Sequence, residues 1–438
     1  MPRMFAPIAI RWMGNIVLAI ALATGAGCGS KPPALVQAPN LFVDAPDNPY
    51  ASVPAELQGN TAMVVYATDR EPETVDGVYG YSAKRSRKVS YGLATVRMGE
   101  PETTWDDLVK FSTTRERKEP VALTLTGIDE RGAWPPFTPP IQVDGHWVDN
   151  PVDVEARAVE TRKLHALLAE RLALTPRKEV FVFVHGYNNT FASGCFRASQ
   201  IWHFTGRGGV PVLFSWPAGS TGLLQGYTRD RESGEFANPH LKMFLRDLVS
   251  CPEVQKIHLI AHSRGTDILA TALRELHVEA RGGGKDTREE LKLGQLVLAA
   301  PDIDLDVFVE RFGADRVGYV PEGLTIYVSP NDKAIGLSQW LFGSVRRIGQ
   351  LSSSDLRPEI ASIARKHPVL SVIDVRAKTI KKGHGYFLDS PACLSDFILV
   401  LRDGRKPGEA NGRPLYDDPN GFWQLRDGYP SAASAKAP

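Results

Sequence analysis

The chain has 438 residues, of which 43% are hydrophobic and 23% charged, and its formal net charge is +1. This length and apolar content suffice for one large α/β domain or two ordinary ones. The balanced charge argues against a protein whose main partner is a nucleic-acid backbone. Four cysteines without a Cys-x-x-Cys spacing exclude a disulfide scaffold and a zinc site of that type.

The N-terminal segment has the pattern of a targeting signal. Arg3 and Arg11 precede an apolar run at residues 16–23, and small residues then lead to Cys28. This order predicts a secretory signal over residues 1–27. The end of the signal resembles a bacterial lipobox, although a glycine stands where a leucine-like residue is usual. We expect an exported protein of the bacterial envelope, held on the membrane by a lipid on Cys28 and facing the periplasm. A cleaved signal with an incidental cysteine is the alternative.

The mature chain is expected to have three regions. Residues 28–59 are rich in proline and alanine and predict a tether. Residues 60–402 carry the apolar pattern of a folded domain. Glycine, proline, aspartate and asparagine dominate residues 403–438 and predict an extended surface tail, with Trp423 and Tyr429 able to dock on the body.

Short apolar runs rich in β-branched residues alternate with helical periodicities inside the domain. The expected strands are Ala62–Thr68, Leu123–Leu125, Val180–Val184, Val212–Phe214, Ile257–Ala261, Leu296–Ala300, Leu324–Val328 and Leu370–Val375. The expected helices include Val154–Leu172, His240–Val249, Ile268–Leu276 and Cys393–Leu401. Continuously apolar strands separated by helices indicate a parallel sheet covered on both faces. The early strands lack intervening helices, which favours a doubly wound open sheet over a (β/α)8 barrel.

A candidate nucleophile, Ser263, follows the strand Ile257–Ala261. Ala261-His262-Ser263-Arg264-Gly265 has small residues two before and two after the serine. A nucleophile elbow needs this spacing, because its tight strand-to-helix turn brings the backbone close to neighbouring strands. The start of the following helix favours developing negative charge. A plain helix N-cap is the structural alternative for Ser263.

A second turn fits this interpretation. The strand that contains residues 181–184 ends in His185-Gly186-Tyr187. In an architecture with a nucleophile elbow, this turn supplies one backbone N–H of the oxyanion hole, which we assign to Tyr187, and Arg264 supplies the other. His185 is expected to brace the loop.

The general base and its acid are expected to follow in the order Ser, Asp, His. Asp332 comes just after one expected strand, and His384 lies in a glycine-flanked loop after the next. His384 would accept the Ser263 proton, and Asp332 would fix the tautomer of the imidazole. Asp302, which also follows a strand, is an alternative acid.

Six short segments in this order resemble bacterial α/β-hydrolases of the esterase/lipase superfamily, catalogued largely as a domain of unknown function. They are residues 65–70, 183–189, 214–217, 261–265, 299–304 and 383–387. The resemblance covers about residues 60–402. It implies an α/β-hydrolase fold, with a mostly parallel doubly wound sheet and helices on both faces, and it implies a serine-hydrolase scaffold without a defined substrate.

Together these residues predict a serine hydrolase that cleaves carboxylic esters through an acyl-enzyme on Ser263, with a small acyl-ester or lipid substrate. A non-catalytic envelope module that keeps the fold for binding or assembly is the alternative. We expect no cofactor, no metal and no nucleic-acid partner. Aromatic residues at 133–137 and 340–342 could wall an acyl pocket, form a lid, or cover the sheet edges. The cation of Arg264 could suit an anionic substrate, but pairing with a nearby carboxylate is favoured. The basic run 84–88 is expected in a solvated loop.

Overall fold

The computed structural model describes residues 32–43, 45–219, 223–332, 335, 347–351, 365–376, 383–419 and 421–431. The chain divides into two compact units, 1–33 and 34–438, and the fold described below is that of the second. The expected signal and Cys28 lie outside the described residues. No helix in the described part of the chain is long and apolar enough to cross a membrane.

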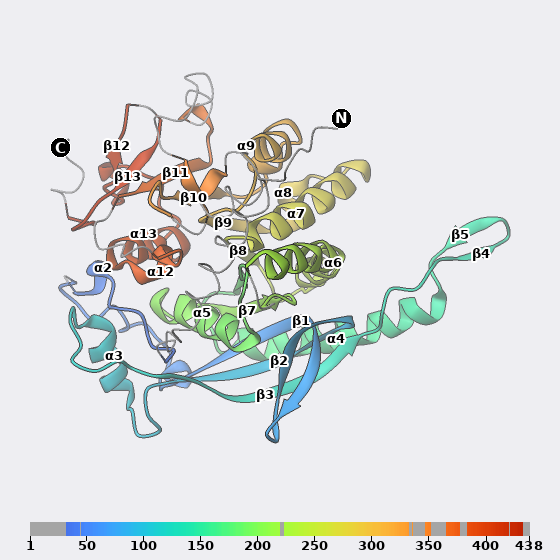
Figure 1. Ribbon diagram of the computed structural model, residues 1–438, viewed down its shortest axis with the longest axis horizontal. Helices are drawn as coiled ribbons and strands as arrows, with labels where there is room; N and C mark the ends of the chain where they lie inside the picture. Colours follow the sequence, from blue (N-terminus) through green and yellow to red (C-terminus); the bar gives the residue numbers. More distant parts are fainter. Residues whose placement is uncertain are drawn as a thin grey trace, which may run out of the picture. The chain divides into compact units, whose positions relative to one another are not determined.

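A mostly parallel sheet forms the centre of this unit (Figure 1). In the described residues its strand order is β12-β13-β11-β10-β9-β8-β6-β7-β1-β2-β3. The strands from β1 through β7, β6, β8, β9, β10 and β11 to β13 run parallel, whereas β2, β3 and β12 are antiparallel to their neighbours. The bounds are β1 Thr61–Val75, β2 Val78–Met98, β3 Leu123–Trp134, β6 Glu179–Val184, β7 Val210–Ser215, β8 Lys256–His262, β9 Leu293–Ala299, β10 Gly323–Val328, β11 Leu370–Val375, β12 Tyr416–Asp417 and β13 Trp423–Leu425. A separate pair consists of β4 Ile141–Val143 and β5 His146–Val148.

Helices cover both faces of the sheet. Those that share one apolar cluster are α4 Pro151–Ala173, α6 Leu223–Ser250, α7 Gly265–Gly282, α8 Thr287–Leu291, α9 Leu305–Phe308 and the π-helix η2 Val309–Ala314. Those that share the other cluster are α2 Asn40–Val43, α3 Trp105–Thr113, α5 Phe191–Phe204, α12 Tyr386–Asp389 and α13 Pro391–Leu401. Short 3-10 turns are η1 Ala55–Leu57, η3 Val317–Tyr319, η4 Ile348–Gln350 and η6 Glu409–Asn411.

Central strands are buried on both sides. Along β6, Val180, Val182 and Val184 belong to one cluster, while Phe181 and Phe183 belong to the other. Since successive side chains of a strand point to opposite faces, such a strand must be apolar throughout. The predicted fold class, a mostly parallel α/β sheet with helices on both faces, is confirmed.

The β1–β2 ribbon differs from the sequence prediction. Residues 84–88 lie within β2 and not in a loop, although Lys84, Arg87 and Lys88 are exposed as expected. The far end of the ribbon extends past the rest of the sheet (Figure 1), so neither of its faces packs on a core there. Without a buried face there is no alternation of apolar and polar residues to indicate a strand.

Residues 34–57 pack on the domain, where the sequence predicts a tether. The Leu35 N–H donates to the carbonyl of Val121 (2.8 Å), next to β3, and Leu35 is buried. At the other end, Arg207 donates through Nη1 to the carbonyl of Leu57 (2.6 Å). A composition rich in proline and alanine is therefore compatible with a docked segment when isolated apolar residues supply the contacts.

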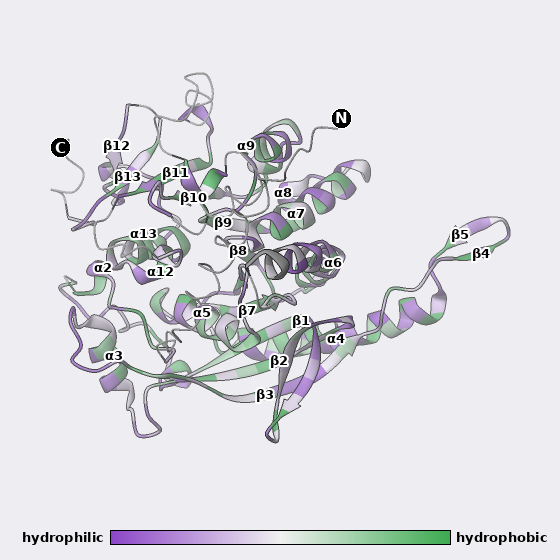
Figure 2. Cartoon of the chain, in the orientation of Figure 1, coloured by the Kyte–Doolittle hydropathy of each residue, from purple (hydrophilic) through white to green (hydrophobic). Residues whose placement is uncertain are grey.

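The C-terminal region also differs from the extended tail that its composition predicts. β13 pairs with β11 and β12 pairs with β13, so the tail adds an edge to the sheet. The Asp396 carboxylate of α13 accepts hydrogen bonds from Arg413 (Nη2 to Oδ2, 2.7 Å) and from the Tyr429 hydroxyl (2.7 Å), all buried. Figure 2 shows hydrophobic residues along α12 and α13. The strands escape prediction because they are only two and three residues long.

Candidate active site

Ser263 lies at a sharp turn between β8 and α7. Its φ is +52°, in the left-handed region that non-glycine residues rarely adopt. The Ser263 N–H donates to the carbonyl of Ala299 on β9 (3.0 Å), and its own carbonyl accepts from the Thr266 N–H (3.0 Å). The N-cap position of α7 falls on Arg264, so Ser263 is not simply a cap. A strained serine between a strand and a helix has the geometry of a nucleophile elbow.

Two glycines allow the elbow to approach the loop after β6. A Cβ on Gly265 would lie 2.6 Å from the carbonyl oxygen of Val184, and closer still to that of His185. A Cβ on Gly186 would lie 2.8 Å from the Cβ of Ser263. No side chain fits at either position without movement. The close approach places the Gly186 backbone beside the serine.

Hydrogen bonds fix the peptide that carries the Tyr187 N–H. The Gly186 carbonyl accepts from Nδ1 of His185 (3.0 Å) and from Nδ2 of Asn189 (3.2 Å). In a trans peptide the N–H points away from the carbonyl. The Tyr187 N–H is therefore aimed away from the two donors that hold Gly186.

His185 braces this loop, as the sequence predicts. Its ring is buried and stacks on Trp216, with 5.4 Å between the ring centroids. Burial, with the nearby Arg70 cation, lowers the pKa of His185 to about 3, so the ring is neutral. Because Nδ1 donates to a carbonyl, Nε2 must accept, and it faces the Ser215 hydroxyl (3.1 Å) and Nη2 of Arg70 (3.4 Å). One tautomer satisfies all these contacts.

A side chain of α6 fixes the peptide between Tyr187 and Asn188. The Asn188 N–H donates to Oδ2 of Asp230 (3.1 Å), and the Gly219 N–H donates to the same oxygen (3.2 Å). Asn188 has a φ of +52°. Buried Asp230 thus joins two loops at the carboxyl edge of the sheet, although its sequence context gave no signal for this role.

His384 and Asp332 form a pair at this edge. Nδ1 of His384 lies 2.7 Å from Oδ2 of Asp332, whose side chain is fully buried, while that of His384 is 23% exposed. Within the described residues no hydrogen bond or ion pair joins the Asp302 carboxylate to His384; this carboxylate lies 3.5 Å from Nε of Arg347. Of the two candidate acids, Asp332 has the geometry that an orienting carboxylate requires.

Ser263 and His384 are linked through His262. Nε2 of His262 donates to the backbone carbonyl of His384 (3.0 Å), and their rings are 4.6 Å apart. Burial and the neighbouring His384 lower the pKa of His262 well below its usual value, so its ring is neutral. In the described residues no hydrogen bond joins Ser263 Oγ to His384; such bonds are often long before substrate binds. The contact of His262 with His384 was not predicted from the sequence, and the only indication of it was the position of His262 directly before Ser263.

Arg264 pairs with carboxylates, the interpretation that the sequence favours. Its Nη2 lies 2.9 Å from Oδ2 of Asp267 and 3.9 Å from Oε1 of Glu235. The other oxygen of Asp267 binds Nη1 of Arg311 (2.6 Å). The side chain of Arg264 is therefore directed to carboxylates of α7 and α6, and only its backbone N–H is a candidate for the oxyanion hole.

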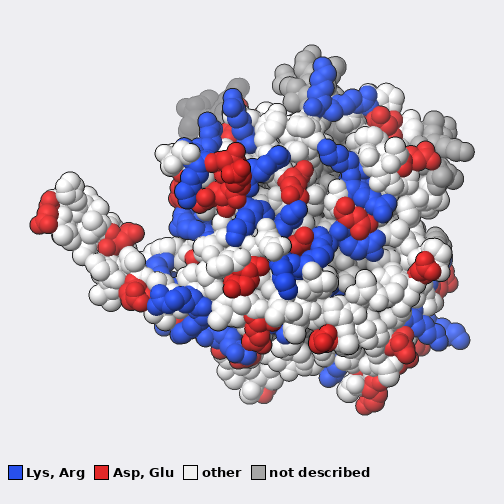
Figure 3. Space-filling model, turned by 180° about the vertical axis from the view of Figure 1, so that it is seen from behind, with Lys and Arg blue, Asp and Glu red and all other residues white. Residues whose placement is uncertain are grey.

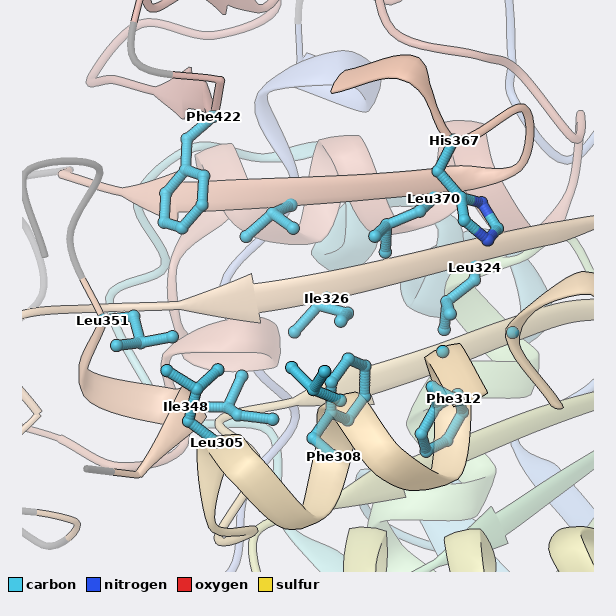
Figure 4. Close-up of a pocket in the computed structure, with 14 residues that line it drawn as sticks. Leu305, Phe308, Phe312, Leu324, Ile326, Ile348, Leu351, His367, Leu370 and Phe422 are labelled. Carbon is cyan, nitrogen blue, oxygen red and sulfur yellow. The ribbon is translucent and has the colours of Figure 1, made fainter. Parts of the chain in front are cut away.

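An apolar cavity of about 150 Å³ lies on the η2 side of β10 and β11 (Figure 4). It is lined by Leu305, Phe308, Val309, Phe312, Gly313, Gly318, Leu324, Ile326, Ile348, Leu351, His367, Leu370, Val372 and Phe422. The η4 turn connects this lining to the acid, since Gln350 donates through Nε2 to the Asp332 carbonyl (2.5 Å). Burial lowers the pKa of His367, so its ring is neutral.

The aromatic segments expected near a pocket do not line this cavity. Trp134 is buried against Tyr91, with ring centroids 4.6 Å apart. Phe137 stacks on His240 (5.5 Å) away from the cavity lining. Residues 340–342 lie outside the described residues. In the described part of the chain, no cluster of three or more His, Cys, Asp or Glu side chains could hold a metal ion.

A parallel sheet with a strained serine after β8 and an Asp–His pair after β10 and β11 defines the α/β-hydrolase class. The family model "Alpha/beta hydrolase of unknown function (DUF900)" matches residues 160–402, more than half of the chain. The chain belongs to this family, as the resemblance of its motifs predicts. No curated protein matches the chain.

Proposed function

We propose that this hydrolase is a serine esterase that cleaves carboxylic esters through an acyl-enzyme on Ser263. The strongest support is the strained elbow of Ser263, whose neighbour His262 contacts His384, together with the pairing of His384 with the buried Asp332 carboxylate. A protein that only binds would have no need to hold a serine at positive φ next to an oriented imidazole.

In the proposed reaction, Ser263 Oγ attacks the ester carbonyl while Nε2 of His384 takes its proton. Asp332 stabilises the imidazolium through Nδ1. The backbone N–H groups of Tyr187 and Arg264 stabilise the oxyanion. His384 then protonates the departing alcohol, and water, deprotonated by the same imidazole, releases the acid and regenerates the serine hydroxyl.

Fluorophosphonate labelling followed by peptide mass spectrometry tests this proposal. The adduct is expected on Ser263, and it should be lost in Ser263→Ala and His384→Ala, each of which should lower the ester-hydrolysis rate by about 10⁶-fold. Asp332→Asn should lose about 10⁴-fold, whereas the matched Asp302→Asn should stay within about tenfold. A folded protein that is not labelled would favour the non-catalytic envelope module. A larger loss in Asp302→Asn than in Asp332→Asn would refute the assignment of the acid.

We also propose that the protein is exported and anchored by a lipid on Cys28. The support is the order of basic, apolar and small residues before this cysteine. Cell fractionation of the wild type and of Cys28→Ser is the test. The wild type should be found with the envelope membranes and the variant in the soluble periplasmic fraction. Equal fractions for the two proteins would refute the lipid anchor, and a cytoplasmic location would refute export.

A further inference from the structure

A projecting arm is the most unusual feature outside the candidate site. We define the arm as residues 135–156, which comprise β4, β5 and the first turns of α4. Figure 1 shows it extending away from the sheet. In the described residues β4 and β5 pair only with each other. An isolated two-stranded hairpin is at best marginally stable in water. Contact with a partner would therefore stabilise this hairpin.

The arm exposes apolar side chains. Half of the large hydrophobic residues that are exposed in the described part of the chain lie on it: Phe137, Ile141, Val143, Trp147, Val148, Val152 and Val154. Trp147 is 69% exposed and Val152 is 74% exposed. Hydrophobic and hydrophilic residues are intermixed along the arm (Figure 2). Clustered exposed apolar residues with a polar rim mark an interaction surface.

The charge of the arm restricts its partner. It carries four acidic residues, Asp144, Asp149, Asp153 and Glu155, and no lysine or arginine. Figure 3 shows acidic side chains along the projecting arm, whereas lysine and arginine begin at its base and lie among acidic residues on the body. An acidic arm is repelled by anionic lipid surfaces. A basic protein surface is the complementary partner.

The chain itself carries such a surface. We define the basic patch as Lys84, Arg85, Arg87 and Lys88 of β2 with Arg229 and Arg231 of α6, all exposed. The two elements touch where Arg85 donates through Nε to the Ser233 hydroxyl (3.0 Å) and through Nη2 to the Arg229 carbonyl (3.3 Å). Within the described residues Lys84, Arg87 and Lys88 form no ion pair. Exposed Val75, Val78 and Tyr79 at the tip of the same ribbon offer apolar contact.

We propose that the arm docks on the basic patch of a second copy of this chain. The arm and the β1–β2 ribbon point in different directions (Figure 1), so the arm of one copy does not reach the basic patch of the same copy. In a two-fold dimer each arm meets the other copy's patch, and two equivalent contacts form. The patch adjoins Asp230, which holds the Asn188 loop, so the partner's arm lies beside the rim of the candidate active site.

Sedimentation velocity of the chain from residue 29 onward, which contains every described residue, tests the proposal. A dimer is expected at micromolar concentration in 0.1 M salt, with at least tenfold weaker association in 0.5 M salt. The arm variant Asp149→Lys/Glu155→Lys and the patch variant Arg87→Glu/Lys88→Glu should each weaken association at least tenfold. The variant with all four changes should recover the dimer, because opposite charges meet again across both contacts.

The control is Lys110→Glu/Lys118→Glu, which reverses two charges at and beyond α3 and should leave association unchanged. Circular dichroism verifies folding of each variant. The proposal is overturned if the wild type stays monomeric at 50 µM (about tenfold above the working range), or if the variant with all four changes does not recover the dimer. Binding to phosphatidylglycerol vesicles that is lost in Trp147→Ser would assign the arm to a membrane and would also overturn it.

Discussion

Gly265→Ala offers a direct test of how the elbow and the loop after β6 depend on each other. The new Cβ would lie 2.6 Å from the Val184 carbonyl oxygen, whereas ordinary contact begins at 3.4 Å. The loop after β6 or the first turn of α7 must therefore move by at least about 0.8 Å, from those two distances, because the His185 carbonyl oxygen lies closer still. A misplacement of about 1 Å typically costs about 10²-fold in rate, and overpacking costs about 1–3 kcal/mol of stability.

The assay is the second-order rate of fluorophosphonate labelling of Ser263, with thermal unfolding alongside. We expect labelling about 10²-fold slower and a lower Tm for Gly265→Ala. Gly282→Ala is the matched control, because Gly282 ends the same helix and a Cβ there meets nothing within 4 Å. This control should label at the wild-type rate. Labelling of Gly265→Ala within about threefold of wild type would refute the argument that close packing sets the reactive geometry.

Three further predictions concern buried polar groups. His262→Phe should lower kcat about tenfold or more with little change in KM, because the His384 backbone loses its donor; equal kcat would deny His262 a positioning role. The pKa of His185 is near 3 in the folded protein and 6.5 in the unfolded chain, so the neutral ring contributes its full stability above pH 6.5 and loses it as the pH falls. Urea unfolding should show the free energy of unfolding fall by about 2 kcal/mol by about pH 5, and this fall should be absent in His185→Asn. Arg413→Met leaves Asp396 buried without its cation and should cost about 3–5 kcal/mol in the same measurement, and a loss below about 1 kcal/mol would contradict this.

The parts of the fold that could be predicted from the sequence are those buried on both sides. β6, β8 and β10 read as continuous apolar runs because each packs helices on two faces. Their carboxyl ends converge, so the residues that follow them, Ser263 and Asp332, could be placed near each other before the structure was known. The assignment of their catalytic roles stays a prediction.

What escaped prediction depends on contacts distant in sequence. Buried Arg207 pairs with no carboxylate among the described residues. It anchors the segment ending at Leu57 through the Leu57 carbonyl, 150 residues away, which no local pattern encodes. β13 is only three residues long, and it forms because its backbone pairs with β11 at the edge of the sheet. Asp230 holds the loop at Asn188 through its carboxylate, and an aspartate inside a helix is usually only a solvated residue.

The docked N-terminal segment has a consequence for the side from which the chain enters the folded unit. Only five residues lie between Cys28 and Ala34, the first residue held against the domain, so even a fully extended chain spans about 20 Å at most between the two. Ala34 bridges Ala122, which precedes β3 in line with Thr61, at the amino edge of the parallel strands. The candidate active site lies at the opposite, carboxyl edge. The chain therefore enters the folded unit at the edge of the sheet opposite the candidate active site, which keeps the carboxyl edge clear of the incoming N-terminal segment.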